Sequence, residues 1–297
     1  MTRLADLAEL VRAPAALSVP GDVLSGAAAA GALGPRTPAL AGASVLLYWA
    51  GMAANDWADR RLDAVERPER PIPSGRVRPS VALGVASGLT AAGLAVATAA
   101  GGRRAAAVAL PLAATIWGYD LRAKNTAAGP AVMAACRGLD VLLGASGGRV
   151  VRALPAALTV AAHTWTVTAL SRREVTGADR RLPGLTLAGT ALIALATPAR
   201  PTPPATGRSG SSRAARLGDL VPAVLAAGYA TRYGRAQARV LADPSPARVR
   251  AAVGAGITGL PALQGALTAR AGARMLGLAV AGAAPLGRRL ARLISPT

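Results

Sequence analysis

The sequence predicts an all-α integral membrane protein, a bundle of about nine transmembrane helices. Of the 297 residues, 52% are hydrophobic, and the mean hydropathy of +0.38 is above that of most soluble domains. Apolar runs also recur along the whole chain. A membrane-spanning helix needs about 20 mostly apolar residues, and fewer suffice where Ala and Gly let helices pack closely.

Dividing the chain by this rule gives nine or ten candidate spans. The segments 184–198 and 219–233 are short, and 219–233 runs into Arg232, Arg235 and Arg239, which suits an amphipathic helix lying at the interface. We expect nine spans in one domain over residues 1–297, with a flexible loop at 199–218 that is rich in Pro, Gly and Ser. The candidate spans are 15–33, 39–56, 80–100, 104–118, 130–147, 151–170, 184–198, 219–233, 249–268 and 272–290.

Basic residues set the orientation of the spans. If the N-terminus is cytoplasmic, most loop arginines fall in the inward loops 57–79, 119–129 and 171–183, as the positive-inside rule requires. Asp6 and Glu9 precede the first apolar run, so we expect no cleaved signal peptide. The expected location is the plasma membrane, with several passes and with the N-terminus and these loops in the cytoplasm.

The net charge of +20 raises the question of a nucleic-acid partner. A nucleic-acid binder gathers Lys and Arg on one soluble face and interleaves aromatic residues for stacking. Here aromatic residues make up 3% of the chain, and the arginines punctuate apolar runs. The composition therefore favours a membrane protein and no nucleic acid.

An acidic stripe lies where the second candidate span meets the cytoplasm. Asp56, Asp59 and Asp63 are spaced i, i+3 and i+7, which places them within an arc of about 60° on one helix face. Crowded carboxylates repel one another unless a cation lies among them, and hard oxygen ligands of this kind suit Mg²⁺ beside substrate phosphates. The alternative is a solvated acidic helix end that pairs with Arg60 and Arg61.

The letters around this stripe resemble the motifs of a known family. Residues 55–63, NDWADRRLD, resemble the NDxxDxxxD motif of the UbiA prenyltransferase superfamily, and residues 70–75, RPIPSG, are similar to its RP-x-x-SG continuation. The resemblance implies a helical bundle with an opening to lipid, whose cytoplasmic end binds a prenyl diphosphate through Mg²⁺. It assigns Asp56, Asp59 and Asp63 to the metal, with Asp56 and Asp59 catalytic, and Asn55 and Arg70 to the diphosphate.

Residues 119–126, YDLRAKNT, follow the fourth span on the same membrane side. Lys124 is the only lysine of the chain. A cation here would stabilise the departing diphosphate, so we assign Lys124 a catalytic role and both Lys124 and Arg122 to diphosphate binding. The alternative is that they are snorkelling residues that fix topology. The segment resembles a tyrosine-and-lysine element of the family, although five positions separate Tyr119 from Lys124 instead of four.

Two further segments depart from the family pattern. Residues 133–140, MAACRGLD, resemble an Arg-x-x-Asn element, with Asp140 in place of Asn, and Arg137 and Asp140 at i, i+3 are placed to pair with each other. The second aspartate-rich motif is expected after the sixth span, where this chain has SRREVTGAD at 171–179. In that stretch Glu174 occupies a plausible metal-ligand position, with Asp179 further away.

Arg172 and Arg173 of the same stretch either neutralise diphosphate oxygens or only fix topology. The Cys-Arg-Gly-Leu and Ser-Arg-Arg-Glu-Val elements resemble the EboC-type branch of the superfamily. Two residues are expected to serve packing. They are Cys136, the single cysteine, and His163, the single histidine, for which we expect a hydrogen-bonded packing role rather than that of a proton acceptor.

The function that the resemblance implies is Mg²⁺-dependent prenyl transfer, in which an isoprenoid diphosphate is ionised, an acceptor is prenylated and pyrophosphate is released. The main alternative is a non-catalytic membrane carrier or assembly factor that keeps a prenyl-lipid pocket. A small-solute transporter is disfavoured, because the two halves of the chain show no matching broken spans. The acceptor, the length of the prenyl chain and the oligomeric state are left open by the sequence.

Overall fold

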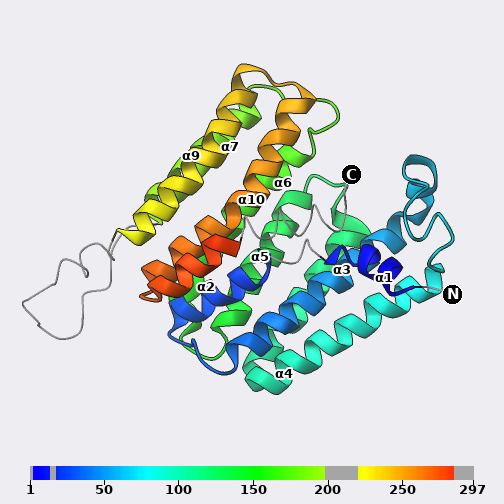
Figure 1. The fold of residues 1–297 in the computed structure, drawn as a ribbon, viewed down its shortest axis with the longest axis horizontal. Helices are drawn as coiled ribbons and strands as arrows, with labels where there is room; N and C mark the ends of the chain where they lie inside the picture. Colours follow the sequence, from blue (N-terminus) through cyan, green and yellow to red (C-terminus); the bar gives the residue numbers. More distant parts are fainter. Residues whose placement is uncertain (1–2, 14–17, 198–219, 284–297) are drawn as a thin grey trace, which may run out of the picture.

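The computed structural model describes residues 3–13, 18–197 and 220–283, and every regular element within these ranges is helical, as predicted. The helices pack side by side into an elongated bundle (Figure 1). A further short apolar helix covers Arg274–Ala283. The elements are α1 (Leu4–Leu10), α2 (Pro20–Ala30), α3 (Thr37–Glu66), α4 (Pro79–Gly118), the π-helical turn η2 (Tyr119–Ala123), α5 (Gly129–Ala145), α6 (Val150–Ser171), α7 (Arg181–Ala196), α9 (Val221–Ala242) and α10 (Pro246–Arg270).

Three of the described helices are long and apolar enough to cross a membrane: Thr37–Glu66, Pro79–Ala123 and Val150–Ser171. This confirms the predicted class of all-α membrane protein. The other described helices are shorter or less apolar, so the count of nine spans stays a prediction, as does a single domain over the whole chain. The predicted loop at 199–218 lies outside the described residues.

Helix α4 is two antiparallel helices joined at a glycine. Gly102 has φ 63° and ψ −154°, a backbone conformation that side chains disfavour and that breaks the helix. The two arms then lie beside each other, because Trp117 Nε1 donates a hydrogen bond to Thr90 Oγ1 at 3.0 Å. Forty residues of straight helix would measure about 60 Å, roughly twice the hydrocarbon thickness. The break confirms that the predicted spans 80–100 and 104–118 are separate helices.

Helices α2 and α5 approach each other through two glycines. A Cβ atom on Gly26 would meet the backbone oxygen of Val141, and one on Gly144 would meet the backbone oxygen of Val23. Each glycine therefore makes room for the main chain of the other helix, the kind of close approach that small residues allow in membranes. This contact fixes α2 against α5, and both helices carry charged residues beside the site described below.

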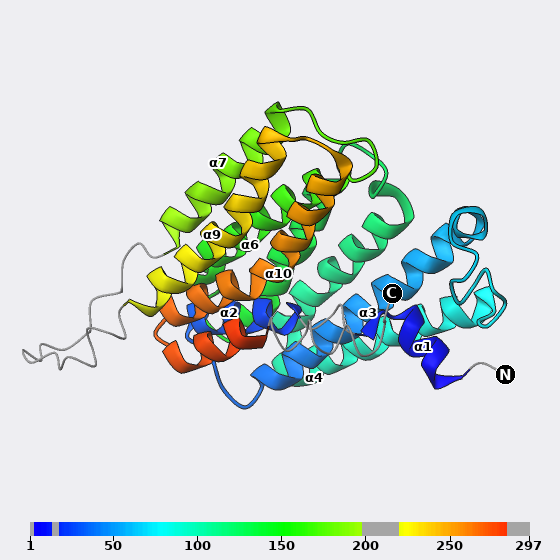
Figure 2. The same cartoon turned by 45° about the horizontal axis from the view of Figure 1, so that its top comes forward.

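Helix α9 packs into the bundle rather than lying at the interface, which corrects our expectation for 219–233. Tyr229, Tyr233 and Val240 lie on one face of α9 and are fully buried in a core shared with α6 and α10. Seen from a second direction, α9 lies alongside α7 and α10 (Figure 2). His163 of α6 is buried here, with Nδ1 2.9 Å from the hydroxyl of Tyr229, which confirms its predicted hydrogen-bonded packing role.

Candidate functional site

The last turns of α3 carry two buried carboxylates that share one cation. Arg70 Nη1 lies 2.6 Å from Asp63 Oδ2 and 3.4 Å from Asp56 Oδ1. Arg12 Nη2 adds a second contact to Asp56 Oδ1 at 2.7 Å. Burying a carboxylate away from water is costly unless a cation and hydrogen bonds replace the water. The acidic stripe predicted from the spacing is therefore neutralised by arginines from other parts of the chain.

Arg70 belongs to the loop between α3 and α4, which folds back over the end of α3. Ser74 Oγ donates a hydrogen bond to the carbonyl oxygen of Arg70 at 2.6 Å, and Gly75 takes a positive φ of 76°. Gly75 thus allows the chain to turn through a backbone conformation that is unfavourable for residues with a Cβ atom. These contacts fold the RPIPSG stretch back over the end of α3. The Arg70 guanidinium is thereby brought into contact with Asp56 and Asp63.

The same loop holds α1 in place and thereby sets the position of Arg12. Arg76 Nη1 lies 3.0 Å from Asp6 Oδ1 and 2.6 Å from Glu9 Oε2. Arg12 follows α1 directly and has a positive φ of 45°, which is uncommon for a residue with a side chain. The N-terminal segment therefore contributes a cation to the site, which the sequence analysis did not anticipate.

Lys124 pairs with the third carboxylate of the stripe. Its Nζ atom lies 2.6 Å from Asp59 Oδ1. The intervening turn η2 is a π-helix, closed by a hydrogen bond from the backbone N–H of Lys124 to the carbonyl oxygen of Tyr119 at 2.9 Å. A π-turn takes up one extra residue, so Tyr119 and Lys124 lie one turn apart despite their five-residue separation. The departure from the family spacing is thus absorbed by the backbone.

The side chain of Asn55 contacts a fourth acid, Asp120, which was not among the predicted site residues. Asn55 Nδ2 donates to Asp120 Oδ1 at 3.2 Å, and Asp120 is buried. Both residues line a hollow of about 260 Å³ that starts beside the acidic stripe. Its other lining residues are Arg12, Tyr48, Gly51, Met52, Ile116, Tyr119, Met133 and Cys136. The hollow is thus polar near Arg12 and Asp120 and mainly apolar beyond them.

The alternative interpretation of the stripe, a solvated acidic end paired with Arg60 and Arg61, does not describe this arrangement. Arg60 lies over the ring of Trp57, 4.7 Å from its centroid, and donates to the carbonyl oxygen of the same residue. The ion pairs of Asp56 and Asp63 instead reach residues of other segments. Asp56 and Asp63 are buried, so they are not a solvated surface pair.

Three of the arginines assigned to the diphosphate lie on the surface of the bundle. Arg122, Arg172 and Arg173 are exposed. Arg172 Nη1 donates to the backbone oxygen of Thr126, which ties the loop after α6 to the loop after η2. Both loops therefore lie at the same end of the bundle as the acidic stripe, as the orientation argument expects.

Glu174 is half-buried at that end, in contact with α10. Its carbonyl oxygen accepts a hydrogen bond from Arg250 Nη1 at 2.8 Å, and burial raises the pKa of its side chain. Across the described residues, no three His, Cys, Asp or Glu side chains are grouped closely enough to hold a metal by themselves. A metal at this end would therefore take part of its coordination from substrate or water.

The expected pairing of Arg137 with Asp140 is wrong. Arg137 Nε lies 2.7 Å from Asp22 Oδ2 on α2, and Asp140 accepts a hydrogen bond from Ser44 of α3. Gln264 Nε2 completes the cluster by donating to Asp22 Oδ1 at 2.6 Å. The close α2–α5 contact brings Asp22 within reach of Arg137, so a long-range partner replaces the local one.

This fold is that of a family of membrane prenyltransferases. The chain belongs to the UbiA prenyltransferase family, whose model matches residues 21–197. That range contains the acidic stripe, Arg70, the π-turn and Glu174. The resemblance of the chain to the superfamily is thereby confirmed, while its resemblance to the EboC-type branch stays a prediction.

Among the relatives, the chain is 44% identical to the digeranylgeranylglyceryl phosphate synthase of Methanothrix thermoacetophila over 80 residues, 26% of this chain and 30% of that protein. It is 46% identical to the bacteriochlorophyll synthase 33 kDa chain of Cereibacter sphaeroides over 54 residues, 18% of each chain. The matched segments thus span less than a third of these relatives. A solved structure described as a digeranylgeranylglyceryl phosphate synthase in membranes superposes with a TM-score of 0.66 at 16% identity, covering 91% of this chain and 99% of that one.

Proposed function

We propose that this protein is a membrane prenyltransferase that ionises an isoprenoid diphosphate and transfers the prenyl group to an acceptor, with release of pyrophosphate. The observation that carries the proposal is the set of charges beside the hollow. Asp56, Asp59 and Asp63 are in contact with four cations, one of which, Arg12, also lines the hollow. Family membership and the names of the two relatives support the same chemistry.

The carboxylates of the stripe fit a hard divalent cation. One guanidinium nitrogen of Arg70 already contacts both Asp56 and Asp63, so a positive group is accommodated between these two side chains. Mg²⁺ commonly binds one or two carboxylates and completes its shell with water and substrate phosphates. Asp56 and Asp63, which share Arg70, would hold it, and we keep Asp59 and Glu174 as further candidate ligands. When bound, Mg²⁺ supplies charge neutralisation for the diphosphate.

The cations of the site are placed to bind the diphosphate oxygens and to stabilise the charge that develops as the allylic carbon–oxygen bond breaks. Arg70 and Lys124 come from two different loops, and Arg12 comes from the N-terminal segment. Guanidinium groups bind phosphate oxygens in pairs, and cations held in a water-poor site are most effective where charge develops. Asn55 adds an amide donor. Arg122, Arg172 and Arg173 extend this positive end outward.

The apolar part of the hollow would shield the reactive carbon. Met52, Ile116 and Met133 line it beyond the charged mouth. The bond to the diphosphate breaks with its electron pair leaving on oxygen, and the allylic cation then takes an electron pair from the acceptor, which loses a proton. Water would trap the same cation as an alcohol, so an apolar wall favours transfer over hydrolysis. The two relatives are named for different products, so the acceptor stays open.

The orientation proposed from the sequence accompanies this function. The loops 57–79, 119–129 and 171–183 lie at the end of the bundle that holds the acidic stripe. We propose that this end, with the N-terminus, faces the cytoplasm and that the membrane is the plasma membrane. A soluble isoprenoid diphosphate headgroup would then reach the site from the cytoplasmic side.

The test uses the full chain in nanodiscs with labelled geranyl, farnesyl and geranylgeranyl diphosphates and a membrane-lipid extract. We expect pyrophosphate and a new prenylated product only with Mg²⁺. Asp56→Asn and Asp59→Asn should lower the rate at least about a hundredfold, a loss typical for removal of transition-state stabilisation. Glu66→Gln is the matched control, because Glu66 lies exposed on the same helix end.

A different result would favour the non-catalytic carrier. In that case each diphosphate binds tightly with Mg²⁺, and Asp56→Asn weakens the binding, yet no pyrophosphate appears with any extract. Equal rates for wild type, Asp56→Asn and Asp59→Asn would remove the acidic stripe from the mechanism altogether.

A further inference from the structure

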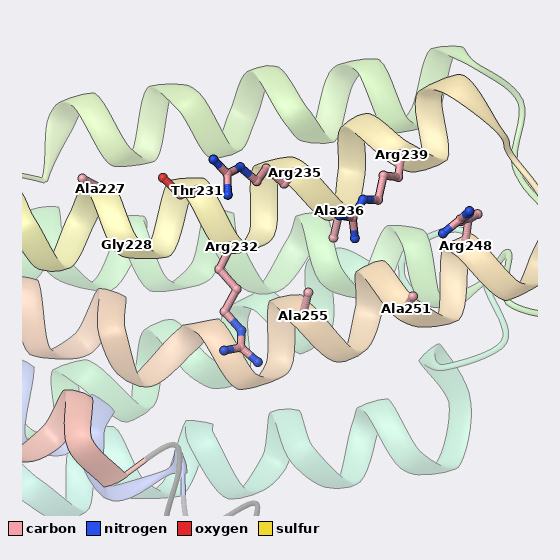
Figure 3. A pocket seen from close by; sticks show the side chains of 10 residues that line it. All are labelled: Ala227, Gly228, Thr231, Arg232, Arg235, Ala236, Arg239, Arg248, Ala251 and Ala255. Atoms are coloured by element: carbon pink, nitrogen blue, oxygen red, sulfur yellow. The ribbon is translucent and has the colours of Figure 1, made fainter.

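A second hollow lies between α9 and α10, away from the acidic stripe, and has a volume of about 610 Å³ (Figure 3). Small side chains form its floor, and four arginines stand along it, three from α9 and one from α10. We call it the arginine groove. Its lining residues are Ala227, Gly228, Thr231, Arg232, Arg235, Ala236, Arg239, Arg248, Ala251 and Ala255.

The arginines of α9 are placed by helical spacing on the outer surface of the bundle. Arg232, Arg235 and Arg239 are spaced i, i+3 and i+7 and so share one face. The face that carries Tyr229 and Tyr233 is buried in the core instead. The three arginines are exposed, and the groove opens away from the core.

The arginines of the groove differ in the partners that the described residues give them. Arg248 Nε has a weak, exposed contact with Asp243 at 3.5 Å, and Arg232 Nη2 donates to Thr258 Oγ1 at 3.0 Å. No carboxylate in the described part of the chain forms an ion pair with Arg235 or Arg239. Like charges three and four residues apart on a helix destabilise one another, so an anion bound between them would be stabilising.

The groove reaches the same end of the bundle as the acidic stripe. The backbone N–H of Ala178 donates to the carbonyl oxygen of Pro244 at 3.1 Å, which joins the α9–α10 turn to the loop after α6. Arg239 and Arg248 flank this turn. Arg232 lies about 10 Å further along α9, at 1.5 Å per residue. With 219–233 as a span, as the sequence predicts, the cations run from the level of the headgroups toward the hydrocarbon.

We propose that the arginine groove binds one anionic phospholipid of the surrounding bilayer. Arg235 and Arg239, with Arg248 across the groove, would bind the headgroup phosphate, whose oxygens match the paired donors of a guanidinium. Basic pockets between transmembrane helices on the cytoplasmic side are known to bind such headgroups. The floor of Ala and Gly leaves room for an acyl chain against the helices. Arginines that only snorkel would not need such a floor. This site is independent of prenyl transfer.

The test is a lipid titration of the purified full chain in mild detergent, read by native mass spectrometry. Short-chain phosphatidylglycerol should bind at least tenfold more tightly than phosphatidylcholine. The double variant Arg235→Gln/Arg239→Gln should bind phosphatidylglycerol about ten- to thirtyfold more weakly, at about fivefold for each arginine. The matched control Arg103→Gln/Arg104→Gln, which changes exposed arginines at the α4 turn, should bind within twofold of wild type.

Two further arms separate the sources of phosphate and guard against misfolding. Inorganic phosphate at the same concentration should not displace the lipid, and photoactivatable phosphatidylglycerol should label wild type within 227–255. Equal affinity of the double variant and wild type, displacement by free phosphate, or labelling confined to other segments would each overturn the proposal. Tight capture of an RNA or an acidic peptide in place of the lipid would do so as well.

Discussion

Lys124 Nζ lies 2.6 Å from Asp59 Oδ1, and this pair joins the turn after α4 to the end of α3. The contact links an acid of the stripe to the only lysine of the chain. It places an ammonium group near Asp120, which lines the hollow together with Asn55.

Replacement of Lys124 by Met should lower kcat about a hundredfold, because an ammonium group beside the leaving diphosphate is lost. Lys124→Arg should recover part of the loss, because the positive charge is kept although a planar guanidinium replaces the ammonium group. Steady-state pyrophosphate release measures both variants. Arg61→Gln is the control, as Arg61 is exposed on the same helix end. A variant Lys124→Met that folds and keeps its full kcat would show that Lys124 only fixes topology.

The π-turn predicts an asymmetry between deletion and insertion. Leu121 is exposed, and its deletion shortens the separation between Tyr119 and Lys124 from five positions to four. An ordinary α-helical turn then places Lys124 on the same helix face as Tyr119. This variant should keep at least about a tenth of the wild-type rate. Inserting Ala after Leu121 rotates Lys124 by roughly 100° and should lower the rate to that of Lys124→Met. Equal losses in the two variants would contradict this geometry.

Gly144→Ala should destabilise the fold, because its Cβ would meet the backbone of Val23 on α2. Overpacking of this kind costs about 1–3 kcal/mol in the free energy of unfolding. The measurement is thermal unfolding in detergent, and Gly84→Ala is the control, since a Cβ at Gly84 meets nothing within 4 Å. If the two variants unfold alike, the α2–α5 approach is not as close as the structure has it.

The docking of α1 should depend on pH through Asp6. The hydrogen bond from the Arg3 backbone N–H, together with the Arg76 guanidinium, holds the pKa of Asp6 below its ordinary value. Such a carboxyl stabilises the folded state above its unfolded pKa of about 3.9 and loses this contribution as the pH falls through its folded pKa. The protection of residues 4–10 against hydrogen exchange, measured relative to the intrinsic exchange rate at each pH, should therefore fall below about pH 4.

At neutral pH the same loss of protection should follow Arg76→Gln and not Arg78→Gln, because Arg76 contacts Asp6 and Glu9 directly. Protection that is kept at pH 3 and in Arg76→Gln would show that apolar contacts of Leu10 hold α1 instead.

Local patterns predicted the parts of the molecule that depend on neighbours in sequence. The three aspartates share a helix face because of their spacing, and the two helices of α4 follow from the apolar runs on either side of Gly102. Both conclusions needed only the helical repeat and the thickness of a bilayer. The class of fold and the position of the acidic stripe were therefore predictable.

Partners distant in sequence were not predictable by such patterns. Arg12 contacts Asp56 from a segment that Arg76 joins to the α3–α4 loop, and Arg137 pairs with Asp22 where two glycines bring α2 against α5. Asp120 appeared in the tyrosine-and-lysine segment, yet its burial beside Asn55 depends on the packing of α3 against the turn η2. Each of these contacts is decided by tertiary packing.

The sharing of Arg70 between Asp56 and Asp63 has a consequence for the way a ligand enters. The three carboxylates already face four cations, Arg12, Arg67, Arg70 and Lys124, before any substrate arrives. Under the proposed function, entry of a metal diphosphate would be an exchange of counterions, in which the carboxylates would turn to the metal and the cations to phosphate oxygens. Each charged group would then trade one partner for another, so no bare ion would have to be carried into surroundings that solvate it poorly.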